Sequence, residues 1–242
     1  MMEPLEVLYQ DEKLIAINKP SGLLVHRSMI DRHETRFAMQ ILRDQVGKHV
    51  YPVHRLDKPT SGVLLFAFDS ETARLMTTLF TEGEVGKTYI AVVRGYTLEQ
   101  DTIDYPLKEE LDKIADKKAD ANKPAQSAVT EYRRLATVEL PHPVGRYQTA
   151  RYSLIEVKPQ TGRKHQIRRH MKHIFHLIVG DTSYGDGKHN EFFRREFNCF
   201  RLMLTASKLE FIHPYTRVPL SLESKADEDF KRISALFEEM NS

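Results

Sequence analysis

The chain has 242 residues, 40% of them hydrophobic and 29% charged, a balance typical of a folded globular protein and not of a disordered one. No stretch is long and apolar enough to span a membrane, and the acidic start of the chain lacks the layout of a signal peptide. A single cysteine, Cys199, excludes an internal disulfide, so we expect a cytoplasmic protein. With a formal net charge of only +2, any nucleic-acid-binding surface would have to be local.

The first half of the chain alternates strand and helix patterns. Short strands are expected at 6–9 and 14–18, and an apolar stripe at helical spacing predicts a helix over 34–46. An unbroken apolar run at 63–68 is typical of a strand buried on both faces. Ser70 is a good N-cap for the helix that follows, and a strand is expected at 87–94.

The second half begins with a charged segment. Residues 99–126 are rich in Asp, Glu and Lys, which predicts an exposed surface insertion with room for a short helix. Strands are expected at 127–138, 148–157 and 200–213, and helices at 161–173 and 226–240. Without a regular strand–helix alternation, the pattern favours an α+β fold with a mixed, largely antiparallel central sheet flanked by helices. We expect one domain over 1–242.

The most specific motif is the run HRLDKPTSG at His54–Gly62. It places one acid, Asp57, in a turn that leads directly into the buried strand, which is where a catalytic group is held rigidly. An Asp before Pro-Thr-Ser-Gly is also a common turn former, so the motif alone leaves a structural role open. A kinase catalytic loop also contains His-Arg-Asp, but the other kinase motifs are missing here.

The predicted helix at 162–173 has a basic character. Ile167 and Met171 mark its buried face, and Arg163 lies four residues before Ile167, so we expect Arg163 to point inward and to need an acidic partner. The alternative is an arginine whose stem packs while its head reaches water. A separate stripe at spacing four is suited to phosphates, and Arg169 lies beside it; its members are Lys164, Arg168 and Lys172.

Four motifs in order give the chain a family resemblance. Besides the Asp57 motif they are NKPSGLLVH at 18–26, KTYIAVVRG at 87–95 and VKPQTGRKHQIR at 157–168, the last continuing into HLIVGDTSYG at 176–185. Together they resemble the RluA family of pseudouridine synthases. The resemblance implies a mixed central sheet with an active-site cleft across it. It also implies a catalytic Asp57, an active-site Tyr89, and an Arg163 that pairs with Asp57.

The resemblance further implies an isomerase that converts a uridine of RNA to pseudouridine without cofactor or metal. The segment from Val25 to Gln45 looks most like the tRNA-directed branch of the family, which acts on a T-stem uridine, and no S4-type RNA-binding domain precedes the motifs. We therefore expect an RNA partner, most readily tRNA, and no membrane partner. Two alternatives are an enzyme for ribosomal RNA or for both RNAs, and an RNA-binding protein without catalysis. We assign six residues to RNA binding: Arg55, Lys19, Lys164, Arg168, Arg169 and Lys172.

Two further patterns were weighed for ligands. His170, His173 and His176 recur at spacing three, but three ligands at that spacing cannot share one helical turn, which argues against zinc. The glycines of 180–187 do not form a Walker motif or a dinucleotide-binding fingerprint. The sequence therefore predicts no metal and no nucleotide cofactor.

Overall fold

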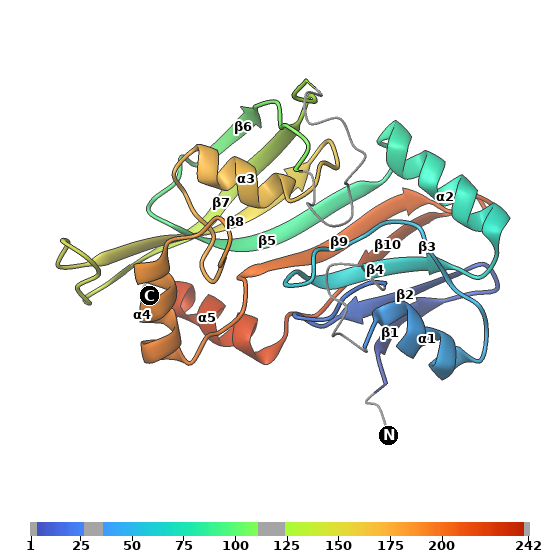
Figure 1. Cartoon of the computed structure of the whole chain (residues 1–242), viewed down its shortest axis with the longest axis horizontal. Coiled ribbons are helices and arrows are strands. Elements are labelled where there is room, and N and C mark those ends of the chain that lie inside the picture. Colours follow the sequence, from blue (N-terminus) through green and yellow to red (C-terminus); the bar gives the residue numbers. More distant parts are fainter. Residues whose placement is uncertain (1–3, 27–35, 111–123, 240–242) are drawn as a thin grey trace. The chain divides into compact units, whose positions relative to one another are not determined.

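The computed structural model describes residues 4–26, 36–110 and 124–239 (Figure 1). They form two compact units, each built from three separate segments of the chain. Unit 1 takes its residues from Met1–Lys87, Lys108–Gln126 and Ala206–Lys225, and unit 2 takes its residues from Thr88–Leu107, Ser127–Thr205 and Ala226–Ser242. Each unit has its own hydrophobic core. The single domain expected from the sequence stays a prediction.

The sheet of unit 1 is built around one buried strand. Strand β4 (Ser61–Ala67) is buried at every residue, as the apolar run predicts. It pairs antiparallel with β2 (Leu14–Lys19), which pairs antiparallel with β1 (Glu6–Gln10). On its other side lie β3 (Tyr51–Pro52) and β9 (Leu204–Ile212), and β10 (Pro219–Glu223) completes the edge by pairing with β9.

Two helices belong to unit 1 in the part of the chain that the structure describes. Helix α1 (Ala38–Val46) begins after the predicted start at 34, and residues 27–35 lie outside the described part of the chain. Helix α2 (Ser70–Glu82) is capped by Asp69, whose side chain accepts a hydrogen bond from the Thr72 amide at 2.7 Å; Ser70, the predicted cap, is its first residue. Met76 of α2 is fully buried in the core that β2 and β4 share.

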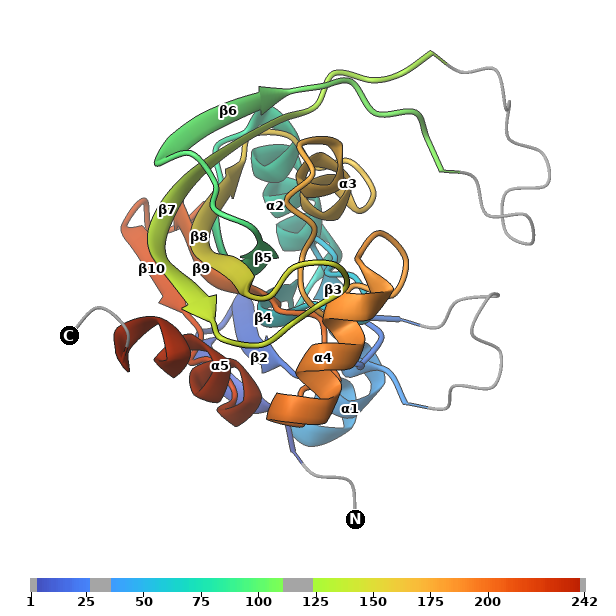
Figure 2. The ribbon, with the colours of Figure 1, turned by 90° about the vertical axis from the view of Figure 1, so that its left-hand side faces the viewer.

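Unit 2 contains a curved antiparallel sheet with three helices. Its strands run in the order β5-β8-β7-β6, and Figure 2 shows α3 inside their curve. Ile167 and Met171 of α3 join the core of this unit, together with residues of α4 and α5. The strands are β5 (Gly86–Arg94), β6 (Gln100–Asp104), β7 (Val129–Leu140) and β8 (Ala150–Pro159); the helices are α3 (Gln166–His173), α4 (Gly187–Phe197) and α5 (Glu228–Glu239).

Two elements of unit 2 differ from the prediction. Residues 100–104, expected within an exposed insertion, form strand β6 at the edge of the sheet, where only Ile103 is buried. An edge strand tolerates polar residues on its solvent-exposed face, so its sequence lacks the apolar pattern that would predict a strand. Residues 111–123 of the same segment lie outside the described part. Helix α4 was not predicted at all; Asp186 caps it, and Phe192 and Phe193 bury its inner face.

The fold class is the predicted one. Every strand pairing with a given register in the described residues is antiparallel, and helices flank the strands, so the α+β class with a largely antiparallel sheet is confirmed. No helix in the described ranges is long and apolar enough to cross a membrane.

Candidate active site

Asp57 stands in a tight turn that is fixed at both ends in unit 1. Its main-chain oxygen accepts a hydrogen bond from the Thr60 amide at 3.0 Å, and its side chain is half-buried. Gly62 then enters β4 with φ +111°, and a Cβ at that position would lie 2.1 Å from the main-chain oxygen of Ala206. Only glycine satisfies both demands, so the Gly of the motif seats the turn against β9.

Lys19 stabilises this turn by hydrogen bonds from its side chain. The lysine is fully buried, and its Nζ donates to the main-chain oxygens of Pro20 at 2.9 Å, Leu23 at 2.7 Å and Lys58 at 3.1 Å. The hydroxyl of Ser21 donates to the Pro59 oxygen at 2.7 Å. The first and second motifs therefore form one structure in which a buried ammonium joins two turns. The assignment of Lys19 to RNA binding is wrong, because its ammonium group is buried and donates hydrogen bonds to main-chain carbonyl groups inside the protein.

His54 holds the other side of the motif. Its Nε2 accepts a hydrogen bond from the Leu65 amide of β4 at 3.0 Å, and its ring stacks on Phe80 at 4.7 Å between centroids. Desolvation, with a smaller effect of Lys87, lowers the pKa of His54 to about 3, so the ring is neutral and carries its proton on Nδ1. The sequence analysis assigned no role to His54. Arg55, the next residue, is exposed, and its role in RNA contact stays a prediction.

Tyr89 lies in unit 2, near the start of β5. It is half-buried, it pairs in register with Val157 of β8, and it packs against the core of unit 2. The predicted role of Tyr89 in catalysis stays a prediction.

Arg163 does not lie where the helical pattern placed it. Helix α3 begins at Gln166, so Arg163 belongs to the turn that precedes the helix, and its side chain is exposed. Its Nε donates to the main-chain oxygen of Ser127 at 3.0 Å. The predicted inward placement beside Ile167 and Met171 is therefore wrong, because a residue outside the helix does not share its faces.

Gln166 shapes the turn that carries Arg163. Its Oε1 accepts from the Thr161 hydroxyl at 2.7 Å and the Arg163 amide at 2.9 Å, and its Nε2 donates to the Val129 oxygen and the Thr130 hydroxyl, both at 2.9 Å. All four hydrogen bonds use one buried amide. The sequence reasoning missed Gln166, although a buried glutamine inside a basic motif is a signal of such a bracing role.

Comparisons with known proteins agree with the motifs. The family described as RNA pseudouridylate synthase matches residues 13–173, which include Asp57, Tyr89 and Arg163. The chain belongs to this family. The enzyme is therefore an RNA pseudouridine synthase, an isomerase acting on uridine in RNA.

Similar proteins cover nearly the whole chain. The tRNA pseudouridine synthase C of Vibrio cholerae is 58% identical over 96% of this chain and 96% of its own length. The protein of that name from Haemophilus influenzae is 54% identical over 96% of this chain and 98% of its own. The solved structure of human RNA pseudouridylate synthase domain containing 4 has a TM-score of 0.72 and 26% identity, covering 96% of this chain and 93% of that one.

Arg168, placed by the sequence in a phosphate-binding stripe of the synthase, is buried. Its Nε and Nη2 donate to the two carboxylate oxygens of Asp181 at 2.8 Å and 2.9 Å, and both side chains are almost fully enclosed. Asp181 also accepts from the amides of Ser183 and Tyr184, each at 2.9 Å. Arg168 therefore fixes the segment after α3, and its assignment to RNA is wrong. The stripe is broken, because Lys164 precedes the helix; Lys164 and Lys172 are exposed and Arg169 is half-exposed.

The three histidines of the synthase do not converge on one point. His170 is buried between the Thr130 hydroxyl at 2.9 Å and the Tyr105 oxygen at 3.0 Å, and desolvation lowers its pKa. His173 stacks on Tyr105, and His176 bonds the Arg94 oxygen through Nδ1 at 2.9 Å. Over the ranges that the structure describes, no cluster of His, Cys, Asp and Glu is arranged to hold a metal ion.

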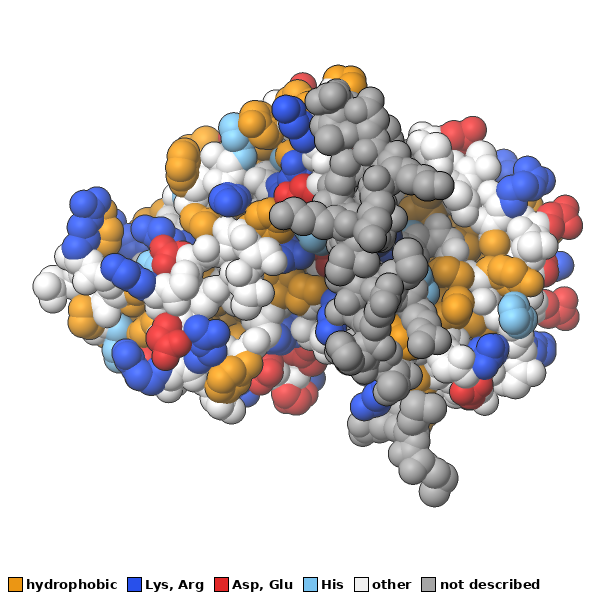
Figure 3. All heavy atoms as spheres, in the orientation of Figure 1, with side chains coloured by type: hydrophobic (Ala, Val, Ile, Leu, Met, Phe, Trp, Pro, Cys, Tyr) orange, Lys and Arg blue, Asp and Glu red, His pale blue; other side chains and the backbone are white. Residues whose placement is uncertain are grey.

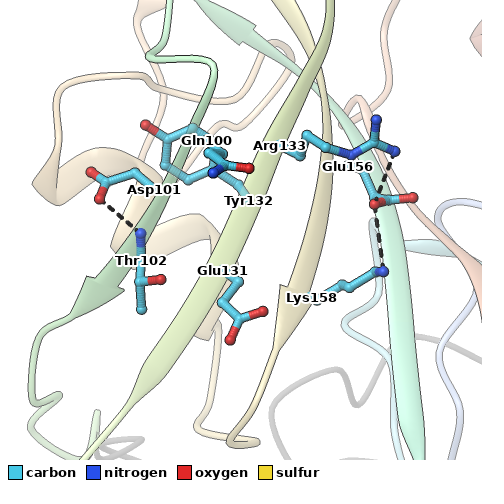
Figure 4. A pocket seen from close by; sticks show the side chains of 8 residues that line it. All are labelled: Gln100, Asp101, Thr102, Glu131, Tyr132, Arg133, Glu156 and Lys158. Carbon is cyan, nitrogen blue, oxygen red and sulfur yellow. Dashed lines mark hydrogen bonds and ion pairs between the residues drawn. The ribbon is translucent and has the colours of Figure 1, made fainter.

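A surface groove of the synthase lies apart from these residues in unit 2. It has a volume of about 480 Å³ and is lined by side chains of β6, β7 and β8 (Figure 4). Glu156 pairs there with Arg133 at 3.4 Å and Lys158 at 3.6 Å, and Asp101 and Glu131 add further negative charge. Such a mixed lining is poorly suited to phosphates, and none of the predicted catalytic residues reaches it.

Proposed function

We propose that this synthase converts a T-stem uridine of tRNA, uridine 65, to pseudouridine. The support is the close similarity to the bacterial enzymes named tRNA pseudouridine synthase C, at 54–58% identity over nearly the whole chain. The observation that carries the catalytic part is the fixed Asp57 turn, which a buried lysine and a glycine entry into β4 hold in place. We further propose a cytoplasmic location and a cleft across the sheet as the place of reaction.

The chemistry follows from the isomerisation. The N1–C1′ bond of the uridine breaks, the uracil turns, and a bond forms between C5 and C1′; C5 then loses its proton and N1 gains one. Asp57 acts at the ribose as a carboxylate, either by attacking C1′ or by removing a ribose proton. Arg163 orients that carboxylate, as the family resemblance implies. Tyr89 stacks on the detached uracil and assists removal of the C5 proton.

RNA binding supplies the energy for exposing the base. Taking a base out of its stack costs a few kcal/mol, which contacts to the RNA backbone offset. Arg55 fills the space left by the base or contacts a phosphate, and Lys164, Arg169 and Lys172 remain the basic residues assigned to phosphates. These roles are proposals for the exposed and half-exposed cations; Lys19 and Arg168 are excluded by their burial.

The proposal is tested by release of tritium from C5 of labelled uracil. The wild type should release about one tritium per tRNA transcript, and a transcript with cytidine in place of uridine 65 should release none. Release from ribosomal RNA in place of tRNA would instead select the alternative substrate. Asp57→Asn should abolish release while binding tRNA with nearly unchanged affinity, because phosphate contacts dominate binding. Turnover by Asp57→Asn would disprove the assigned role.

A further inference from the structure

Helix α3 ends with an unusual residue. The amide of His176 donates to the Met171 oxygen at 2.9 Å and the amide of Phe175 to the Lys172 oxygen at 3.0 Å, which is the Schellman arrangement of a helix end. In this arrangement Phe175 takes the left-handed conformation, with φ +62°. Glycine is favoured at this place, because a Cβ crowds the backbone when φ is positive.

Three other helix ends in the described residues follow that preference. Helices α1 and α2 end on Gly47 and Gly83, and α4 ends on Asn198, all with positive φ. Phe175 departs from it and gains no burial in exchange, since 83% of the residue is exposed. The fold therefore gains nothing visible from an aromatic ring here, although it bears the strain of the backbone. This departure from the local preference points to a functional role for Phe175.

Aromatic and basic residues precede Phe175 in the last turn of α3. Tyr105 and His173 stack with ring centroids 3.6 Å apart and planes within 16°, and both residues are exposed. Lys172 is exposed in the last turn of α3, with its Nζ 5.7 Å from the centroid of the Tyr184 ring, and Asp104 directly precedes Tyr105 in the chain. Figure 3 shows hydrophobic, histidine and basic side chains gathered over α3 on the face turned to the viewer. We call Tyr105, Lys172, His173 and Phe175 the α3-end surface.

We propose that the α3-end surface binds the RNA substrate by stacking an unpaired base on Phe175, with Lys172 at an adjacent phosphate. Aromatic rings presented next to cations are the means by which proteins hold unstacked bases, because every base offers a flat face and every nucleotide a negative charge. The α3-end surface lies one helix length, about 12 Å, from the turn that carries Arg163. The α3-end surface would thus contact the RNA in addition to the reaction site, and this inference rests on the proposed function.

A fluorescence experiment tests the contact directly, because the chain has no tryptophan. Phe175→Trp places a single indole on the α3-end surface, and Phe200→Trp places one at another phenylalanine that is 70% exposed. The RNA is the tRNA transcript, or the ribosomal RNA if only that RNA releases tritium with the wild type. We expect the RNA to quench the indole at 175 and to leave that at 200 unchanged. Equal quenching at both positions, or none at 175, would overturn the proposal.

A second variant separates binding from folding. Phe175→Gly relieves the strained helix end, so it should unfold at the same temperature as the wild type or higher. It should nevertheless weaken RNA binding between about 5-fold and 150-fold, the range expected for loss of one stacked base. Phe200→Ala should change neither quantity. Unchanged RNA affinity in Phe175→Gly, with wild-type tritium release intact, would refute the α3-end surface while leaving the proposed function standing.

Discussion

Two basic side chains assigned to RNA on sequence grounds serve the protein interior instead. Lys19 and Arg168 are both buried, and each is surrounded by oxygen atoms from its own chain. A buried cation without such partners would lose far more hydration energy than packing returns. These residues therefore act by shaping two segments, the Asp57 turn and the loop after α3.

Replacing Lys19 tests its bracing role. Lys19→Met leaves three main-chain oxygens without their donor, and hydrogen bonds to a charged group contribute roughly 1.5–3 kcal/mol each. We expect the free energy of unfolding to fall by at least about 2 kcal/mol, and kcat to fall more than KM rises, because the Asp57 turn loosens. The measurement is urea unfolding beside tritium release. Lys48→Met removes an exposed lysine of the same unit whose Nζ lies over the Phe68 ring, and it should change stability by no more than about 1 kcal/mol. Equal effects of the two variants would contradict the bracing role.

Replacing Arg168 tests the buried ion pair. Arg168→Met should cost about 3–5 kcal/mol of stability, because it strands the carboxylate of Asp181. Burial alone would raise the pKa of Asp181, but Arg168 and the amides of Tyr184 and Ser183 outweigh it, so the pKa is lowered. A lowered pKa means that the pair stabilises above the ordinary value of 3.8 and loses this contribution as the pH falls.

In Arg168→Met, the stability contributed by Asp181 should depend on pH in the opposite direction. Without Arg168 the carboxyl favours protonation, so the stability gap between wild type and Arg168→Met should narrow from pH 8 to pH 4.5 in chemical unfolding. Arg169→Met, at the half-exposed neighbour, is the matched control and should show a small gap that does not vary in this way. A gap for Arg168→Met that does not change with pH would show that the loss of stability does not come from the unpaired Asp181 carboxylate.

At the scale of elements, the titratable side chain of His54 links the Asp57 motif to β4. The ring of His54 accepts the Leu65 amide of β4, and desolvation lowers its pKa to about 3. Because the unfolded chain takes up this proton near pH 6.5, the contribution of His54 is complete above that pH. It is lost as the pH falls toward 3, at up to about 1.4 kcal/mol per pH unit.

Nuclear magnetic resonance of the imidazole nitrogens checks this prediction. The ring of His54 should stay neutral, with its proton on Nδ1, throughout pH 5–8, and urea unfolding should show stability declining below pH 6.5. His54→Gln should flatten that decline, because it removes the proton-accepting ring. A midpoint for His54 close to 6.5 would mean that the ring is solvated and not held by β4.

The start of α3 depends on one amide. Gln166→Glu keeps the shape of the side chain but replaces the Nε2 donor, so the Val129 oxygen and the Thr130 hydroxyl would face a carboxylate. We expect a loss of about 1–3 kcal/mol in stability. We also expect a lower kcat with little change in KM, because the Arg163 turn loses its brace. Gln160→Glu makes the same chemical change at an exposed position nearby and should leave both quantities unaltered. A higher KM with unchanged stability and unchanged kcat would instead indicate that Gln166 contacts RNA directly.

Across the whole molecule, charge is nearly balanced, so affinity for RNA must come from few exposed cations. Lys164→Ala and Lys172→Ala should each reduce the steepness with which tRNA affinity falls with salt, by at most about one unit on logarithmic axes. Lys158→Ala is the control, because Lys158 already pairs with Glu156 at 3.6 Å. Parallel salt dependences for all the proteins would show that the α3 region is only a solvated surface.

How far the sequence predicts this structure depends on the range of each interaction. The strand β4 and the Asp57 turn were predictable, because an unbroken apolar run and a turn motif are local signals. The burial of Arg168 was not, because its partner Asp181 is thirteen residues away and on no shared pattern. The role of Lys19 was not predictable because its partners are main-chain oxygens, which leave no trace in the side-chain sequence. The role of Gln166 was not predictable because two of its partners, the Val129 oxygen and the Thr130 hydroxyl, lie more than thirty residues away.

The order in which the chain supplies β4 and its neighbours has a consequence for synthesis. β4 is complete at Ala67, whereas β9, which lies beside it in unit 1, is complete only at Ile212. A ribosome must therefore translate most of the message before the apolar β4 gains that partner, and until then the nascent chain carries an uncovered strand edge of the kind that invites aggregation. A product cut short before Leu204 would keep the Asp57 motif and yet lack the strand that seats it, so premature termination should yield insoluble fragments rather than a weakened enzyme.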